Sequence, residues 1–455
     1  MEVDKIAESF FEAPAVTLEK GIEVTEQAEK KLVSKKPFKA AEEYFNTLGP
    51  GLTTGAADDD PSGIATYSQT GAQYGFQLLW LSLFSFPLMA VVQEMCARIG
   101  LVTGEGLAAN IRRQYPKKVL YLCVSLLFVA NTFNLGADLG AMAKATQLLV
   151  PGAQFAFLII GFALVSLLLQ IFTTYARYAK YLKYLTLVLL SYVLTAFMIH
   201  LDWGHIVLST LMPTISFSRG QLLLICAILG TTISPYLFFW QTSQEVEEEI
   251  LRGKDTLQLR RAKTSKEELS RMRTDVWTGM FFSNIVMFFI IVVCAATLAV
   301  HGITNIATAD QAALALRPLA GEGAYLLFAL GIIGTGMLAI PTLAGSASYA
   351  ISESFKWNTG LYRKLKEAYA FYGVIIVSMI IGLLLNFTHL DPIKALIYSA
   401  VANGLIAPVV LVLIVQLSSN KKIMGAHANN ALTKWVGWVT VGLMTIAGLA
   451  VLVTL

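Results

Sequence analysis

Long apolar runs separated by short charged connections dominate the chain. Eleven runs are long enough to cross about 30 Å of hydrocarbon as helices. Two are interrupted, the first by three consecutive aspartates and a proline and the sixth by hydroxyl residues and a proline. We therefore predict an all-α polytopic membrane protein with broken first and sixth helices. The runs lie near residues 46–72, 76–101, 118–148, 153–172, 181–200, 220–241, 276–300, 324–350, 369–387, 393–417 and 432–454.

The first break carries charge that a helix facing lipid could not tolerate. Each aspartate of Asp58–Asp60 would cost roughly 2.5–3.5 kcal/mol at the bilayer centre. Pro61 lacks an N–H and Gly63 is conformationally free, so the helix should end here. Non-helical backbone at membrane depth survives only inside protein or beside a water-filled cavity. We interpret the break as a cation-binding site.

The interruption of the sixth run is informative because of where it lies in the order of the helices. Hydroxyls of Thr231, Thr232 and Ser234 beside Pro235 could simply bond back to a kinked helix. However, the first and sixth helices each open a set of five, and the second set enters the membrane with reversed orientation. Two interrupted helices at matching positions of inverted repeats indicate a transporter site. Helix ends near Asp58 and Thr231 would both direct free carbonyls there, and such an all-oxygen cage suits a hard cation.

The predicted organisation has four parts. Residues 1–44 form a cytoplasmic N-terminal tail, and 45–200 form the first five-helix repeat. Residues 201–417 form the second repeat, in which the charged cytoplasmic loop 242–275 is interpreted as a solvated helix pair rather than a regulatory site. Residues 418–455 provide an additional eleventh helix.

The distribution of Lys and Arg predicts the orientation. Connections from odd to even runs carry at most one Lys or Arg each, whereas even-to-odd connections are basic. By the positive-inside rule, the N-terminus is cytoplasmic and the C-terminus extracytoplasmic in a multi-pass cell membrane protein. The basic connections contain Arg112, Arg113, Lys117 and Lys118; Arg177 and Lys180; Arg252 through Arg273; Lys356, Arg363, Lys364 and Lys366; and Lys421 and Lys422.

The amino-acid composition agrees with a polytopic membrane protein and limits the binding partners to be expected. Of 455 residues, 56% are hydrophobic and 14% charged, which excludes an ordinary soluble domain. No basic stripe interleaved with aromatic residues is present, so nucleic acid is not an expected partner. The expected partners are the lipid bilayer and a divalent metal ion as substrate, with no cofactor and with a monomer as the functional unit.

The first-helix block, residues 49–80 (GPGLTTGAADDDPSGIATYSQTGAQYGFQLLW), resembles that of the natural resistance-associated macrophage protein (Nramp) family of divalent metal transporters. The resemblance covers helices one to ten and implies the LeuT-type fold. On this alignment, Asp60 takes the place of the metal-binding aspartate and Gly63 that of an asparagine. Thr231 takes the place of the alanine whose carbonyl binds metal, and Ser234 that of the methionine whose sulfur does so.

The departures from the family pattern point to one branch. A thioether favours transition metals, so Ser234 in its place, with Gly63, should admit hard ions and widen the cavity for a hydrated Mg²⁺. Tyr236 stands where the family has a histidine, and Ala141 where it has a glutamate. The chain looks like the Nramp-related magnesium transporters, which implies uncoupled Mg²⁺ and Mn²⁺ import.

Other polar residues rank lower as ligands. Asp58 and Asp59 could bind the ion or only raise the negative potential of its vestibule. Asn403 could reach a hydrated ion, although packing against the first helix also explains it. Asp138 is expected to be a satisfied structural remnant, and Glu94 and Arg98 a local ion pair.

Three other functions remain as alternatives. A proton-coupled Mn²⁺/Fe²⁺ symporter of the same fold would need a protonatable relay, which Tyr236 and Ala141 do not provide. A sodium-coupled amino-acid symporter would direct helix N-termini at an anionic substrate. An intramembrane aspartyl protease would need a carboxylate pair sharing a proton, and LGADLG around Asp138 lacks the Gly-x-Gly-Asp motif of that family. We therefore expect a transporter and not an enzyme.

Overall fold

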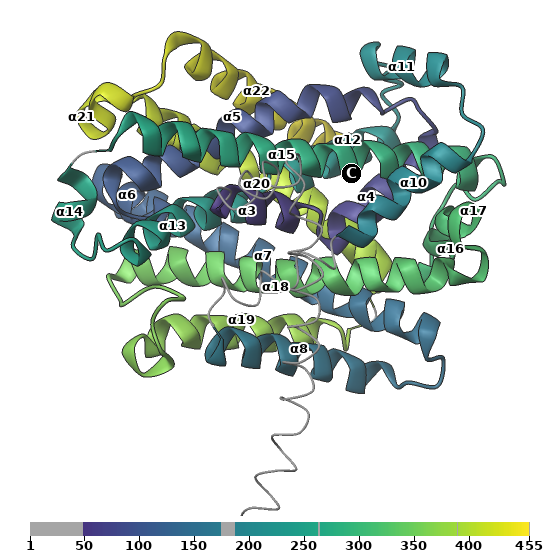
Figure 1. The fold of residues 1–455 in the computed structure, drawn as a ribbon, viewed down its shortest axis with the longest axis horizontal. Coiled ribbons are helices and arrows are strands. Elements are labelled where there is room, and N and C mark those ends of the chain that lie inside the picture. The colour runs from purple at the N-terminus through teal and green to yellow at the C-terminus, as the bar shows by residue number, and fades with distance from the viewer. Residues whose placement is uncertain (1–48, 174–186, 263, 389, 455) are drawn as a thin grey trace, which may run out of the picture. The chain divides into compact units, whose positions relative to one another are not determined.

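The computed structural model describes residues 49–173, 187–262, 264–388 and 390–454. The predicted tail 1–44 and part of the fifth predicted helix, 174–186, lie outside the described residues. From Pro50 onward, the described chain consists of helices and their connections, with no strand (Figure 1). The all-α prediction is confirmed.

Within the described residues, eight helical segments are long and apolar enough to cross a membrane, and two more are shorter. Together with the broken first helix they account for the eleven predicted runs. The long segments are α5 (Trp80–Thr103), α7 (Lys117–Leu149), α8 (Phe155–Phe172), α12 with α13 (Arg219–Thr232 and Pro235–Leu251), α15 with η2 (Lys266–Cys294 and Ala295–Ala299), the segment Ala309–Phe355 ending in α18 (Ala324–Phe355), α20 (Pro392–Ser419) and α22 (Ala431–Thr454). The shorter ones are η1 with α10 (Leu187–Leu189 and Leu190–Met198) and α19 (Tyr369–Leu385).

Both predicted breaks are present, and both are built in the same way. The first run divides into α3 (Pro50–Asp58) and α4 (Pro61–Tyr74), and the sixth into α12 and α13. At each break an extended residue holds the N-cap position of the second half-helix: the Asp60 side chain accepts from a helix N–H, whereas Ser234 makes no side-chain cap bond. A proline follows at the first helical position, where its missing N–H leaves no helical bond unmade. The extended residue and the proline together divide each helix, whereas the prolines inside α5, α18 and α20 do not interrupt those helices.

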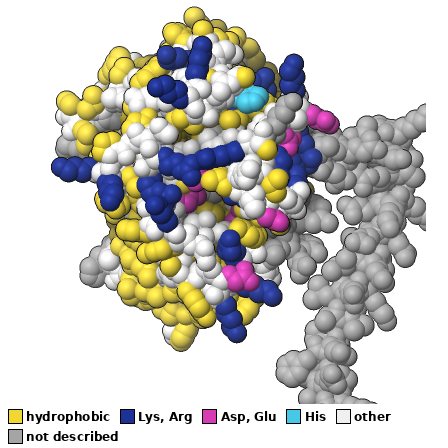
Figure 2. Space-filling model, turned by 90° about the vertical axis from the view of Figure 1, so that its left-hand side faces the viewer, with side chains coloured by type: hydrophobic (Ala, Val, Ile, Leu, Met, Phe, Trp, Pro, Cys, Tyr) yellow, Lys and Arg dark blue, Asp and Glu magenta, His cyan; other side chains and the backbone are white. Residues whose placement is uncertain are grey.

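Short helices cover the two ends of the bundle. We call one the basic end, where α6 (Leu107–Gln114), α14 (Leu257–Ala262) and α21 (Lys421–Met424) lie (Figure 1). The opposite end carries α11 (Trp203–Leu211), α16 (Ala309–Ala313) and α17 (Arg317–Ala320). Figure 2 shows Lys and Arg side chains gathered across the face of the basic end, with acidic groups in the hollow between them.

The segment 242–275 differs from the predicted solvated loop. Helix α13 continues to Leu251 and α15 begins at Lys266, so only α14 and its flanks connect them. Three glutamates of this segment, Glu245, Glu247 and Glu249, are buried against the bundle. The prediction that this charged segment faces solvent is wrong for these three carboxylates, because the bundle covers them.

Glycines hold the half-helices close to their neighbours. A methyl group added at Gly55 of α3 would lie 2.3 Å from the Gly279 carbonyl oxygen of α15. One added at Gly230 of α12 would lie 2.1 Å from the Ala400 carbonyl oxygen of α20. Small residues permit such close helix crossings inside membranes. The two breaks are thereby fixed in the middle of the bundle.

Candidate metal site

The two breaks meet. A methyl group placed on Gly63 would lie 3.2 Å from Thr231 Oγ1 and 3.3 Å from the Asp58 carbonyl oxygen. The Tyr236 hydroxyl of α13 donates a hydrogen bond of 3.1 Å to the Ala57 carbonyl at the end of α3. This bond joins residues 179 positions apart, so the unwound parts of helices one and six face each other, as expected for inverted repeats.

Asp60 lies at the centre of a hydrogen-bond network that fixes its carboxylate. Its Oδ1 accepts from the Gly63 N–H at 2.7 Å and from the Ser62 hydroxyl at 2.6 Å, which caps α4. Its Oδ2 accepts from Asn134 Nδ2 of α7 at 3.0 Å, and Ser399 of α20 donates to Asn134 Oδ1 at 2.8 Å. A carboxylate has about four acceptor positions, so three bonds hold Asp60 and leave it one for a cation.

Thr231 and Ser234 are joined to each other. The Ser234 hydroxyl lies 2.6 Å from the Thr231 carbonyl oxygen and 2.7 Å from the Gly230 carbonyl oxygen, and its single hydrogen is shared between them. The Thr231 hydroxyl is buried and makes no hydrogen bond of ordinary geometry. Carbonyl and hydroxyl oxygens thus gather at the end of α12, and the Ser234 lone pairs and the Thr231 hydroxyl are open to a ligand.

Asp58 and Asp59 share a partner on α15. The Ser283 hydroxyl lies 2.5 Å from Asp58 Oδ2 and 3.2 Å from Asp59 Oδ1. Asp58 Oδ1 is buried with no hydrogen-bond partner. Both carboxylates therefore contact α15 through one hydroxyl, and Asp58 keeps a fully buried oxygen that a cation could satisfy.

Asp138 of α7 corrects one expectation. It is fully buried, and neither carboxylate oxygen has a hydrogen-bond partner, so it is not the satisfied remnant that the sequence indicated. Asn403 of α20 is similarly buried with both amide atoms unpartnered. Unpaired buried polar groups are costly, so Asp138 and Asn403 each have unmet hydrogen-bonding capacity that a ligand or water could satisfy.

The atoms at the two breaks that could bind a cation are all oxygens. Among the described residues, no three His, Cys, Asp or Glu side chains gather as a metal cluster. A cation here would be held by one or two carboxylates, backbone carbonyls, hydroxyls and water, which is the ligand set of hard divalent ions.

The residues at the two breaks are closed off from solvent. The three aspartates are 0–4% exposed, and a side chain at Gly63 would meet three atoms within 3.3 Å. The expected widening at Gly63 is therefore absent here, because Thr231 and Tyr67 fill the space that the glycine leaves. A hydrated ion could enter only when the breaks separate.

Two clamps close the basic end. Asp275 of α15 accepts from the N–H groups of Gly51 at 2.6 Å and Leu52 at 3.0 Å, and so caps the start of α3. One turn later, the Thr54 hydroxyl donates to Gln241 of α13 at 2.5 Å. A carboxylate at a helix N-terminus also gains from the helix dipole. The first half-helix is thereby tied to both α15 and α13.

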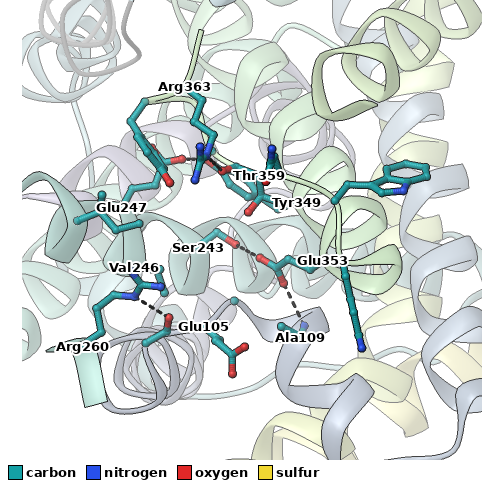
Figure 3. Close-up of a pocket in the computed structure, with 18 of the residues that line it drawn as sticks. Glu105, Ala109, Ser243, Val246, Glu247, Arg260, Tyr349, Glu353, Thr359 and Arg363 are labelled. Atoms are coloured by element: carbon teal, nitrogen blue, oxygen red, sulfur yellow. Dashed lines mark hydrogen bonds between the residues drawn. The ribbon is translucent and has the colours of Figure 1, made fainter. Parts of the chain in front are cut away.

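The second clamp joins α6, α13 and α18. Glu353 of α18 points between two elements and accepts from the Ala109 N–H of α6 at 3.1 Å and from the Ser243 hydroxyl of α13 at 3.2 Å (Figure 3). Glu247 of α13 accepts from the Tyr349 hydroxyl and from the Leu361 N–H. These bonds surround a cavity of about 270 Å³ at the basic end.

Sequence reasoning missed Asn134, Ser283, Ser399 and Asp275 as partners of the breaks. Asn134, Ser283 and Ser399 each lie in an otherwise apolar run, where a polar residue was the available signal, whereas Asp275 ends a charged segment that hid it. The expected Glu94–Arg98 ion pair is confirmed at 3.4 Å, and Arg273 and Trp277 of α15 extend it at 2.9 and 2.8 Å.

The chain resembles known metal transporters in sequence and fold. The profile described as natural resistance-associated macrophage protein-like matches residues 51–454. The divalent metal cation transporter MntH of Klebsiella pneumoniae is 26% identical over 413 residues, which is 87% of this chain and 91% of that protein. MntH of Pectobacterium carotovorum is 26% identical over 407 residues, which is 86% and 89%.

Solved structures show the fold. The Eremococcus coleocola manganese transporter superposes with a TM-score of 0.71 at 18% identity and covers 91% of this chain and 87% of its own. Mhp1, a nucleobase-cation-symport-1 family transporter, superposes with a TM-score of 0.53 at 16% identity and covers 90% and 91%. These likenesses place the two broken helices in a LeuT-type fold. With its family match extending over nearly the whole described region, this chain belongs to the Nramp family of divalent metal transporters.

Proposed function

We propose that the protein imports Mg²⁺ and Mn²⁺ down their electrochemical gradients without proton coupling, as in the Nramp-related magnesium transporter branch. The observation that carries the proposal is the oxygen-only chemistry of the two breaks. Asp60, Asp58, the α12 carbonyl end and the hydroxyls of Thr231 and Ser234 offer hard donors. A soft thioether that would favour transition metals has no counterpart at Ser234. Gly63 adds room once the breaks separate.

The driving force follows from the membrane potential. A divalent ion gains about 4.6 kcal/mol per 100 mV, which is roughly three decades of accumulation. The proposal places the basic end in the cytoplasm, with the N-terminus inside, the C-terminus outside and a monomer as the working unit. Release then occurs at the end that the Asp275 and Glu353 clamps close, so their opening is the predicted inward-facing step.

A second candidate is a proton-coupled Mn²⁺/Fe²⁺ symporter. Asp138 favours it, because a buried carboxylate with two unpartnered oxygens could take up and release a proton. Against it, Tyr236 uses its hydroxyl to bond the Ala57 carbonyl, and Ala141 has no titratable group. Tyr236 thus holds the first break to the sixth helix instead of relaying a proton.

Simultaneous ion and proton measurements distinguish the two functions. The purified protein is placed in liposomes with one lumenal dye for Mg²⁺ or Mn²⁺ and another for pH. The proposal predicts uptake of both ions with no lumenal acidification beyond that of protein-free liposomes. Acidification that follows metal uptake, and that Asp138→Asn removes, would establish the symporter. Absence of Mg²⁺ uptake alongside Mn²⁺ uptake would overturn the magnesium assignment.

A further inference from the structure

A basic groove lies at the basic end, where α18 ends and α7 begins. It has a volume of about 700 Å³, which is within the range of ligand sites. Acidic side chains are absent from its lining among the described residues, and aromatic rings of Tyr121 and Phe355 form one wall. Its cations are Arg112, Arg113, Lys117 and Lys356.

Only part of this positive charge is balanced within the described part of the chain, where Arg112 interacts electrostatically with Glu105 and Glu353. Arg113 forms an ion pair of 2.7 Å with Glu105, which also pairs with Arg261 at 2.7 Å. Arg112, Lys117 and Lys356 make no direct ion pair there, and both lysines are exposed. Three cations around one cavity therefore favour an anionic ligand with several oxygens.

The groove continues into an apolar, outward-facing surface. Tyr121 stacks on Phe355 with ring centroids 6.0 Å apart, and Phe355 stacks on Trp357 at 5.1 Å. All three rings are exposed at the ends of membrane-spanning helices, where aromatic side chains sit at the headgroup level. Farther along α7, Leu122 and Val129 are 55% and 65% exposed on one face. These exposed side chains offer apolar surface for acyl chains on the same helix that carries Lys117 and Tyr121.

We propose that this groove binds the headgroup of an anionic phospholipid, with its acyl chains along the exposed face of α7. Cations, interfacial rings and a lipid-facing helix side occur in the order in which a phospholipid presents phosphate, glycerol and hydrocarbon. A soluble phosphate would use the cations but not the rings or the α7 face. The groove abuts the loop after α18, whose Leu361 N–H bonds Glu247, so the lipid lies beside the clamp of Figure 3. The inference rests only on the membrane location of the chain and not on which ion it carries.

Native mass spectrometry of the full-length protein tests the proposal. The protein is titrated with phosphatidylglycerol and phosphatidylcholine of the same acyl chains. The wild type is expected to retain one phosphatidylglycerol in preference to phosphatidylcholine. Each cation near a charged surface contributes about fivefold, so Arg112→Gln/Lys117→Gln/Lys356→Asn should weaken binding on the order of 100-fold. Asn suits position 356, because its φ is 62°.

The matched control removes three charges elsewhere on the basic end. Lys421→Gln/Lys422→Gln/Lys434→Gln should leave phosphatidylglycerol retention within about threefold of the wild type, because these exposed lysines lie outside the groove. Equal loss in both triple variants would refute a specific site, and so would equal retention of the two lipids by the wild type.

A single-residue variant and a competition with inorganic phosphate complete the test. If the triple variant does not fold, Lys117→Gln alone, at an exposed side chain, should weaken phosphatidylglycerol binding about fivefold, and unchanged binding would overturn the proposal. The second measurement is a competition between phosphatidylglycerol and inorganic phosphate. Displacement of phosphatidylglycerol by phosphate at equal concentration would assign the groove to a soluble anion instead of a lipid.

Discussion

Replacing Asp60 by asparagine separates the two roles of this side chain, helix cap and cation ligand. Asparagine caps helices as well as aspartate does, so the bond from the Gly63 N–H can be kept. The new amide would face Asn134, which can turn its own amide oxygen toward it while Ser399 accepts from its nitrogen. We therefore expect Asp60→Asn to fold with nearly wild-type thermal stability.

Its effect on transport should be large. A carboxylate and a divalent ion about 4 Å apart attract by about 8 kcal/mol at an effective dielectric constant of 20. If one third of that survives the cost of removing both groups from water, binding falls about 100-fold in the variant. Uptake of Mg²⁺ and Mn²⁺ into liposomes at low ion concentration should therefore be abolished.

Asp60→Ala is the informative comparison. It removes the cap, at a cost of about 0.5–2 kcal/mol, and leaves Asn134 Nδ2 without its partner. It should lose uptake and thermal stability together, whereas Asp60→Asn should lose uptake alone. An Asp60→Asn protein that retains half of the wild-type uptake at low ion concentration would refute the assignment of Asp60 as a ligand.

Three more changes test other parts of the structure. Ser234→Met should raise the Mn²⁺/Mg²⁺ uptake ratio about tenfold, equivalent to about 1.4 kcal/mol, and a ratio equal to that of Ser234→Ala would contradict the ligand assignment. Asp275→Asn weakens the cap on α3 by about 1 kcal/mol, so a cysteine introduced at Thr54 should react about fivefold faster with a thiol reagent applied from the basic end; unchanged labelling would show that this clamp does not control access. Gly55→Ala forces a methyl group against the Gly279 carbonyl and should cost about 1–3 kcal/mol of stability, seen as a lower melting temperature. Gly152→Ala, which meets nothing within 4 Å, should leave the melting temperature unchanged, and equal melting of both variants would disprove tight packing of α3 on α15.

The breaks could be predicted from the sequence because their causes are local. Asp60-Pro61 and Ser234-Pro235 each supply an N-cap residue type followed by a proline, which favours ending one helix and beginning another at that point. The opposite orientation of the two five-helix repeats followed from counting apolar runs. If the two repeats share one fold, their broken first helices occupy matching positions and meet.

The partners of the site could not be predicted, because they come from distant helices. Asn134 meets Asp60 across 74 residues and Ser283 meets Asp58 across 225. Which face of α7 or α15 turns toward the breaks depends on how several long helices pack, and the apolar pattern of a buried helix gives little indication of face. The same limit explains Asp138, whose unpartnered state reflects a neighbourhood that no local pattern describes. Likewise, the charge run after α13 looked solvent-exposed although Glu245, Glu247 and Glu249 are buried.

The position of a bound ion would show whether the two breaks form the metal site. Crystals grown with Mn²⁺ and measured at the manganese absorption edge would give an anomalous difference peak at the ion's position. We predict one strong peak between the two breaks, within coordination distance of an Asp60 oxygen and of oxygens at the end of α12, and no such peak in Asp60→Asn. A peak elsewhere in the bundle, or one that persists between the breaks in Asp60→Asn, would contradict this prediction.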